Sequence, residues 1–276
     1  MKVQAQAKVN LALDVIGKRN DGYHELDMIM APISLYNEIE INIHPADQIT
    51  CDGGVIPDRS TIHKTLALLR KEMGLRNHYA IHVIKRIPDQ AGLAGSSADA
   101  AAVFRAVMAI EGLNLELEQQ LELAKQIGAD VPFCLVNQTA RVQGIGEKIR
   151  VLSQKWKLPC LIVKPCYGIS TPEAFEQWHA QMPVHVDVDA VEKAIQDQDF
   201  GSLCQRMGNA LEKPAFQLRP ELKELKEKME TLGFERVMMS GSGSSLMGFS
   251  QDLKILKHAK ELCSNRGCFV EIVTIG

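Results

Sequence analysis

A glycine-rich stretch between a predicted strand and a predicted helix most constrains the fold of this chain. Residues 87–102 read IPDQAGLAGSSADAAA. The run before them, 79–85, partly alternates apolar and polar residues as a strand does, and the Ala-rich run 100–110 is typical of a helix. Gly92 and Gly95 allow a tight turn and leave the main chain open to a ligand. The order predicts a strand–turn–helix unit.

The start of this helix is a candidate phosphate site. Ser96 and Ser97 stand at positions typical of N-caps, where first-turn N–H groups have no intrahelical partner. These N–H groups and the positive end of the helix dipole together favour an anion. The stretch is not a Walker A loop, because no Gly-Lys-Ser/Thr follows at the required spacing. The alternative is a junction that needs glycine only for its geometry, and the loop alone leaves both interpretations open.

Composition describes an ordinary globular protein with one large domain or two small ones. The chain has 276 residues, 46% of them hydrophobic and 24% charged, and a formal net charge of −3. This charge gives no electrostatic basis for binding nucleic acid or an anionic membrane. No apolar run is long enough to span a bilayer, and the N-terminal residues enter a predicted strand, so we expect no signal peptide.

Cysteine and histidine usage points to a reducing compartment. The seven cysteines are scattered and form no C-x-x-C pair, and the eight histidines show no metal-ligand spacing. A disulfide framework or a zinc site is therefore not expected. Reduced thiols are typical of a cytoplasmic protein, and we expect this location.

Two polar pairs occur near the N-terminus. Lys8 and Asn10 lie on one face of a predicted strand, where Lys8 is either an edge charge that discourages aggregation or a charge in a cleft. Tyr23 and His24 follow turn residues 20–22 and are either chance surface residues or part of a ligand site. In both cases the residue pattern favours the interpretation without a ligand: an edge charge for Lys8, and chance surface residues for Tyr23 and His24.

A third polar position is Asp130, between a helix predicted at 116–127 and a run, 131–134, expected to be extended. Pattern alone favours an Asx-turn carboxylate over a catalytic group. Other regular elements are predicted further along the chain. They are helices at 61–73, capped by Ser60, and at 188–196, 200–206, 220–232 and 253–265, and strands at 236–239 and 268–272.

The second half of the chain begins after a polar stretch, 153–157, without continuous periodicity. We therefore expect domains at 1–153 and 154–276. Thr171 begins a predicted helix in which Phe175 is either a core residue or a ligand contact. Residues 240–245 read SGSGSS between strand-like runs, which favours a tight hairpin over a flexible linker.

Taken in order, these segments resemble the GHMP kinases, the superfamily of galactokinase, homoserine kinase, mevalonate kinase and phosphomevalonate kinase. The loop is similar to the superfamily's phosphate loop, and 240–245 to the glycine-rich turn that buttresses it. Three segments, AKVNL (7–11), DGYHEL (21–26) and GADVPF (128–133), resemble the family of 4-diphosphocytidyl-2-C-methyl-D-erythritol kinases. The loop departs from the commoner GGSSD by reading GSSAD, so Ser96 must tolerate the backbone angles of that position.

The resemblance implies an α+β fold of two domains, a ribosomal-S5-like nucleotide half followed by a ferredoxin-like half. It implies transfer of the ATP γ-phosphoryl group, with Mg²⁺, to the 2-hydroxyl of 4-diphosphocytidyl-2-C-methyl-D-erythritol, a step of the non-mevalonate isoprenoid route. The expected partner is this small molecule with its cytidine diphosphate moiety. Two alternatives stay open: another small-alcohol kinase of this fold, and a catalytically idle nucleotide-binding regulator.

The resemblance also assigns roles to residues. Asp130 would take the proton from the attacking hydroxyl, and Lys8 would hold Asp130 ionised and polarise that hydroxyl. An aromatic residue and a histidine would hold the cytosine base. The residues assigned to the substrate are Asn10, Tyr23, His24, Thr171 and Phe175.

The ATP phosphates would lie on the loop amides and the helix N-terminus, with Mg²⁺ bridging them. The residues assigned to ATP are Pro88, Asp89, Gln90, Ala91, Gly92, Leu93, Ala94, Gly95, Ser96, Ser97 and Ala98.

Overall fold

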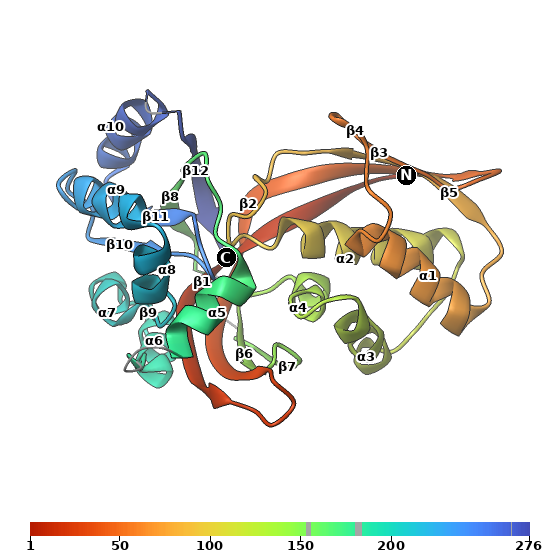
Figure 1. Cartoon of the computed structure of the whole chain (residues 1–276), viewed down its shortest axis with the longest axis horizontal. Coiled ribbons are helices and arrows are strands. Elements are labelled where there is room, and N and C mark those ends of the chain that lie inside the picture. The colour runs from red at the N-terminus through yellow and green to blue at the C-terminus, as the bar shows by residue number, and fades with distance from the viewer. Residues whose placement is uncertain (153–155, 180–183, 266) are drawn as a thin grey trace. The chain divides into compact units, whose positions relative to one another are not determined.

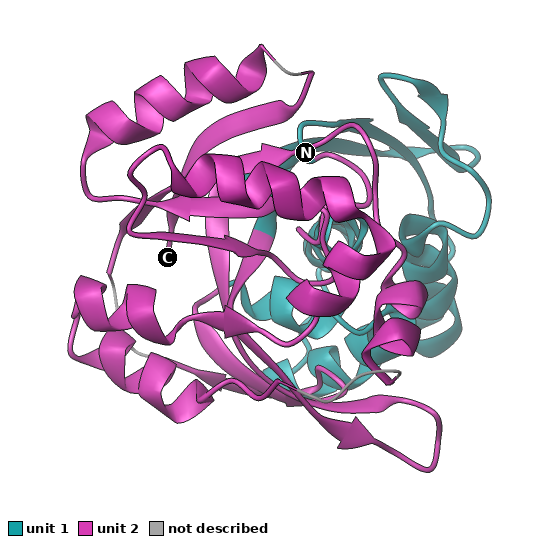
Figure 2. Cartoon of the chain, turned by 60° about the vertical axis from the view of Figure 1, so that its left-hand side comes forward, with its two compact units in different colours: residues 1–7, 35–87, 94–137 teal, residues 8–34, 88–93, 138–276 magenta. Residues whose placement is uncertain are grey.

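The computed structural model describes residues 1–152, 156–179, 184–265 and 267–276, and these form two compact units (Figure 2). The first unit comprises residues 1–7, 35–87 and 94–137, and the second comprises 8–34, 88–93 and 138–276. Strands β1 (Lys2–Lys18) and β2 (His24–His44) run through both. The expected boundary at residue 153 lies outside the described residues, so the division into 1–153 and 154–276 stays a prediction.

The first unit contains a sheet built on the C-terminal part of β2. Glu38–His44 pairs antiparallel with β5 (His78–Ile84), which pairs parallel with β3 (Gln48–Cys51), and β3 pairs antiparallel with β4 (Gly54–Val55). The parallel pairing of β3 with β5 requires a crossover, which a helix provides. Alternate residues of β5 are buried, as expected for a strand with one covered face.

Four helices cover one side of this sheet (Figure 1). They are α1 (Thr61–Met73), α2 (Gly95–Ile110), α3 (Leu117–Ile127) and α4 (Val131–Val136). The predicted helix α1 is confirmed, with Ser60 capping its N-terminus and Gly74 in the left-handed region, φ 66°, ending it. Helix α2 is buried almost all round from Ala98 to Met108 and packs against α1 and α4, so it forms the centre of the unit.

The second unit contains a sheet in the order β10-β11-β8-β12, which continues to β2 at Ile275↔Ile33. Its strands are β8 (Leu158–Lys164), β10 (Arg236–Met239), β11 (Leu246–Phe249) and β12 (Phe269–Ile275). The N-terminal part of β2 also pairs with β6 (Ala140–Gly144), which pairs with β7 (Lys148–Val151), and β1 pairs parallel with the short β9 (Gly208–Asn209). Strand β8 is central and almost wholly buried.

Helices of the second unit pack around these strands (Figure 1). Helix α10 contacts β8 and β12, α9 contacts β10, and α5 contacts α8. The predicted helices at 188–196 and 200–206 are confirmed, and those at 220–232 and 253–265 are confirmed within two residues. The helices are α5 (Thr171–His179), α6 (Val188–Gln196), α7 (Phe200–Arg206), α8 (Glu212–Leu218), α9 (Pro220–Glu230) and α10 (Leu253–Ser264).

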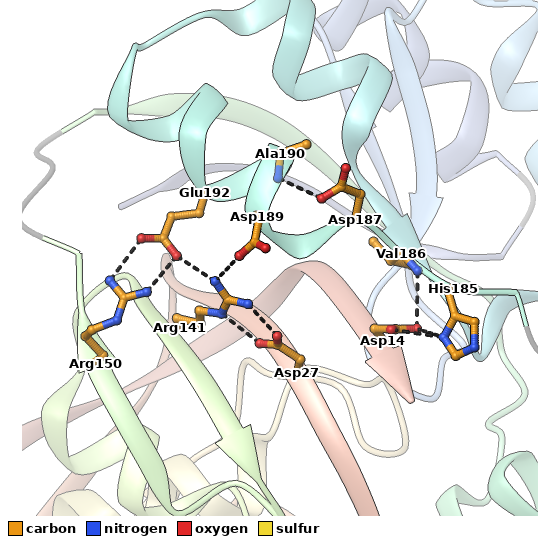
Figure 3. Close-up of polar contacts among 10 residues, drawn as sticks. All are labelled: Asp14, Asp27, Arg141, Arg150, His185, Val186, Asp187, Asp189, Ala190 and Glu192. Atoms are coloured by element: carbon orange, nitrogen blue, oxygen red, sulfur yellow. Dashed lines mark hydrogen bonds and ion pairs between the residues drawn. The ribbon is translucent and has the colours of Figure 1, made fainter. Parts of the chain in front are cut away.

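A network of ion pairs joins α6 to the strands of the second unit (Figure 3). Arg141 on β6 forms a two-bonded pair with Asp27 on β2 and also binds Glu192 and Asp189 of α6, and Arg150 on β7 binds Glu192. Asp27, Arg141 and Glu192 are largely buried, and the attraction between their opposite charges offsets part of the cost of removing them from water.

Candidate active site

The phosphate loop of the second unit packs tightly against the glycine-rich turn between β10 and β11. Gly92 has φ 72°, and a Cβ placed on it would lie 2.1 Å from the carbonyl oxygen of Ser240. The hydroxyl of Ser240 donates to the Gly92 carbonyl at 3.2 Å. We expected the face of Gly92 to be open for a ligand. Ser240 instead fills the side of Gly92 where a Cβ would point, and contact of the Gly92 main chain with ATP stays a prediction.

Main-chain bonds and one side chain fix this turn. The N–H groups of Ser244 and Ser245 donate to the carbonyls of Gln90 and Ala91, at 3.4 and 3.2 Å. Asn209 on β9 donates to the carbonyls of Met239 and Gly241, at 2.9 and 2.8 Å. The turn therefore buttresses the loop as predicted, and the predicted hairpin is confirmed by the Met239↔Leu246 register.

Lys8 and Asn10 lie beside the loop and the turn. Their side chains are 5% and 1% exposed, and Lys8 Nζ donates to Asn10 Oδ1 at 2.7 Å. The main-chain N–H of Lys8 donates to the Leu93 carbonyl, and that of Asn10 to the Ser240 hydroxyl. Because the Lys8 side chain is buried and its main-chain N–H is bonded to Leu93, the interpretation of Lys8 as an exposed edge charge is wrong.

The predicted base-binding pair lies at the turn that precedes β2. Tyr23 is 59% exposed, and its N–H is held by the Asp21 carboxylate. His24 begins β2 and stacks on Phe175 of α5, with ring centroids 4.4 Å apart. Burial lowers the pKa of His24, with smaller contributions from His179 and Lys18.

Thr171, at the start of α5, reaches the glycine-rich turn. Its hydroxyl lies 2.8 Å from that of Ser242. The second unit therefore brings two groups of predicted residues together: one around Lys8, Asn10 and the loop, and one around Tyr23, His24 and Phe175. The same helix, α5, carries Thr171 and Phe175 to these two groups.

The second half of the loop and the start of α2 belong to the first unit. Ala94, with φ 56°, occupies the N-cap position, and α2 begins at Gly95. The predicted N-caps Ser96 and Ser97 are wrong, since both lie inside the first helical turn, and the positive φ is at Ala94 instead of Ser96. The first-turn N–H groups of this 16-residue helix have no intrahelical partner, as an anion site requires.

Close packing against a neighbouring side chain favours glycine at position 95. A Cβ there would lie 3.0 Å from Cγ2 of Ile87, which is 3% exposed. The entry and exit of the loop therefore touch each other within the first unit. A bulky residue at 95 would disturb this contact as well as any ligand.

A buried amide outside the predicted set also holds the ends of the loop. Asn37 on β2 is 1% exposed, and its Oδ1 accepts from the N–H groups of Arg86 and Ile87, each at 2.8 Å. Its Nδ2 donates to Asp99 of α2 at 2.9 Å. The amide accepts through its oxygen and donates through its nitrogen, so one side chain makes all three hydrogen bonds.

Asp130 stands at the N-cap position of α4. The run after it, expected to be extended, is a short helix in which Pro132 occupies one of the first two positions. The Asp130 carboxylate makes no capping bond to this helix. Asp130 belongs to the first unit and Lys8 to the second, and their pairing stays a prediction.

Two family models match the chain on either side of its middle. The model described as GHMP kinases N terminal domain matches residues 60–138, and the model described as GHMP kinases C terminal matches residues 191–264. The chain is 38% identical over 252 residues to a 4-diphosphocytidyl-2-C-methyl-D-erythritol kinase of Bacillus velezensis, covering 90% of this chain and 87% of that protein. A Clostridium kluyveri protein of the same name is 38% identical over 257 residues, 92% of each chain.

This chain belongs to the 4-diphosphocytidyl-2-C-methyl-D-erythritol kinase family. A crystal structure of a 4-(cytidine 5'-diphospho)-2C-methyl-D-erythritol kinase superposes with a TM-score of 0.85 at 32% identity and covers 100% of this chain and 99% of that one. A homoserine kinase of Cytophaga hutchinsonii has a TM-score of 0.76 at 17% identity, covering 99% of this chain and 93% of that one, which shows the shared fold. The predicted GHMP-kinase fold is confirmed.

Disulfides, membrane-spanning helices and metal-ligand groups were also considered in the sequence. In the described structure, none of the seven cysteines forms a disulfide. Within the described residues, no helix is long and apolar enough to cross a membrane, and no group of three or more His, Cys, Asp or Glu side chains is placed to hold a metal ion.

Four residues of this kinase were missed by sequence reasoning. Ser240 lay inside a recognised motif, but its contact with Gly92 spans 148 residues. Asn209 and Asn37 carry no local pattern that separates them from surface asparagines. His179 follows Phe175 by one helical turn, and that spacing was a usable signal.

Proposed function

We propose that this chain transfers the γ-phosphoryl group of ATP to the 2-hydroxyl of 4-diphosphocytidyl-2-C-methyl-D-erythritol, in the cytoplasm. Family membership supports this reaction, and the main structural support is the burial of two polar side chains beside the loop. Lys8 and Asn10 are buried side by side against the loop and the glycine-rich turn. Burial of a lysine costs free energy, and a site for a phosphoryl acceptor explains why it is retained.

Phosphoryl transfer asks the protein mainly for alignment and charge stabilisation. The first-turn amides of α2 and the loop hold the phosphates. Mg²⁺ takes most of its ligands from phosphate and water in kinase sites, and the hydroxyls of Ser96 and Ser97 are oxygen donors that fit it. When bound, the ion neutralises charge that develops on the transferred group.

The acceptor side uses two charged residues. Asp130 takes the proton of the 2-hydroxyl, and Lys8 stabilises the negative charge on the oxygen that attacks. Asn10 orients Lys8 through the 2.7 Å bond to its Nζ. Tyr23, His24 and Phe175 bind the cytosine base, since an exposed aromatic and an imidazole can supply stacking and a polar edge.

An ATP-consumption assay over a panel of alcohols tests this function. We expect turnover with the cytidine diphosphate-linked alcohol and little with methylerythritol phosphate, homoserine or mevalonate. Mass spectrometry of the product should show one added phosphoryl group. Equal turnover of an alcohol without the cytidine moiety would overturn the substrate assignment, and no turnover with any alcohol would overturn the kinase assignment.

A further inference from the structure

A second histidine, from α5, holds the imidazole of His24. The Nε2 atoms of His24 and His179 lie 2.7 Å apart. Phe175, which stacks on His24, precedes His179 by four residues, so both lie on the same face of α5. One helix face thus contacts His24 through a ring stack and a hydrogen bond.

The hydrogen bond between the two imidazoles constrains where their protons lie. It requires one N–H donor and one nitrogen lone pair. When His179 donates, His24 Nε2 accepts, and a neutral His24 carries its proton on Nδ1. In the part of the chain that the structure describes, His24 Nδ1 makes no hydrogen bond. The tautomer of His179 therefore determines whether His24 Nδ1 is a donor or an acceptor toward a ligand.

The same cluster of rings contains another unsatisfied polar group. Trp178 meets His24 and His179 edge-on, with centroids 5.9 and 5.3 Å away. It is 8% exposed, and its Nε1–H has no acceptor among the described residues. Buried polar groups in folded proteins are normally hydrogen-bonded, so the unpaired Trp178 Nε1–H, beside the unbonded Nδ1 of the half-buried His24, indicates a place for a polar ligand.

We propose that His179 is a positioning residue that orients His24 and sets the tautomer in which His24 Nδ1–H donates to the pyrimidine base. The inference rests on the proposed function, which assigns His24 to that base. Cytosine presents acceptors at N3 and O2, which match an Nδ1–H donor. Uracil also accepts at O2 but carries an N–H at N3, so an Nδ1–H donor disfavours uracil only where it bonds to N3.

The test compares three variants of the full chain. His179→Phe keeps an aromatic ring but removes both nitrogens, and His179→Gln keeps an amide N–H that can donate. His258→Phe on the exposed side of α10 is the matched control. Steady-state kinetics give the KM for the cytidylated alcohol, the KM for ATP and kcat, and ¹⁵N NMR of the histidine rings reports which nitrogen of His24 is protonated.

We expect His24 to be protonated on Nδ1 in the wild type and to shift toward the Nε2–H tautomer in His179→Phe. The KM for the cytidylated alcohol should rise about 3- to 10-fold, as expected for one hydrogen bond, with kcat and the KM for ATP within about twofold. His179→Gln should largely restore the wild-type values, and His258→Phe should match them.

Two kinds of failure are distinguishable. A wild-type protein that does not phosphorylate the cytidylated alcohol overturns the proposed function, and the ¹⁵N spectra then still decide whether His179 sets the tautomer. An active wild type whose His179→Phe variant keeps the same His24 spectrum and the same KM overturns the role of His179. A rise in both KM values together would also overturn it, because that result indicates general damage.

Discussion

Ser240 and Gly92, 148 residues apart in the chain, are joined by a hydrogen bond from the Ser240 hydroxyl to the Gly92 carbonyl. The Ser240 carbonyl also fills the space where a Cβ on Gly92 would lie. The first half of the phosphate loop is therefore shaped by the C-terminal half of the chain.

Gly92→Ala should destabilise the protein and weaken ATP binding. The variant combines strain at φ 72° with a clash against main chain that cannot move away as a flexible side chain could. Gly112→Ala is the control, because Gly112 has φ 64° but nothing within 4 Å of the added Cβ. The control should lose only about 1–2 kcal/mol of unfolding free energy. Equal losses in urea denaturation and equal ATP affinities for the two variants would contradict the packing role of Gly92.

Asn209→Asp should lower stability and raise the KM for ATP. The carboxylate keeps the acceptor for the Leu211 N–H but loses both donors to the carbonyls of Met239 and Gly241. Each unsatisfied buried carbonyl costs about 1–3 kcal/mol. The glycine-rich turn, and with it the loop, should shift. Thermal unfolding and steady-state kinetics measure both effects.

Asn77→Asp serves as the control for Asn209→Asp. Asn77 donates to Glu111 at 2.9 Å in the first unit, and the change sets two carboxylates against each other there. This variant should lose stability while its KM for ATP stays unchanged. An unchanged KM in Asn209→Asp would show that the turn is not needed to shape the loop.

Asp130→Asn should reduce kcat by about 10²- to 10⁴-fold, the range typical for loss of a general base. The amide keeps the shape of the side chain but cannot accept the hydroxyl proton. Affinity for ATP, measured by calorimetry, should be nearly preserved, because Asp130 is assigned to the acceptor. Turnover close to the wild-type value would show that Asp130 is a structural turn residue and not the general base.

Tyr23→Ala should raise the KM for the cytidylated alcohol about 5- to 150-fold, which corresponds to a stacking contribution of about 1–3 kcal/mol. Tyr23 is 59% exposed, so the change should leave the unfolding temperature nearly unaltered. The KM for ATP is the internal control. If both KM values rise equally, Tyr23 does not contact the base.

His24 should make stability depend on pH below about 6.5, its ordinary pKa. Its pKa is lowered in the folded protein, so on acidification the unfolded chain takes up this proton first. The free energy of unfolding should therefore fall as the pH drops below 6.5 and level off once the folded pKa is passed. Lys18 and His179 are the charged neighbours that add to the effect of burial.

Denaturation at pH 7.5 and 5.5 measures this dependence. The wild type should lose more stability over this interval than His24→Gln, because only the wild type carries the lowered pKa of His24. A steeper loss in His24→Gln would show that the folded pKa of His24 is not lowered.

Local signals in the sequence determined much of this protein. Ser60 and Gly74 bound α1 because an N-cap oxygen and a left-handed C-cap act within one helical turn. The strand–loop–helix order, the hairpin at 240–245 and the matching motifs likewise depend on neighbours in the chain. Such features need no knowledge of distant contacts, which is why sequence alone predicted them.

Other features were decided by the tertiary structure. Ala94 takes the N-cap position in place of the serines, and the run after Asp130 is helical. The buried amides of Asn209 and Asn37 satisfy main-chain groups tens of residues away. A buried polar group must find a partner wherever the fold provides one, and this requirement leaves no periodic trace in the sequence. The sequence determined which residues could do the chemistry, and the fold determined which neighbours hold them in place.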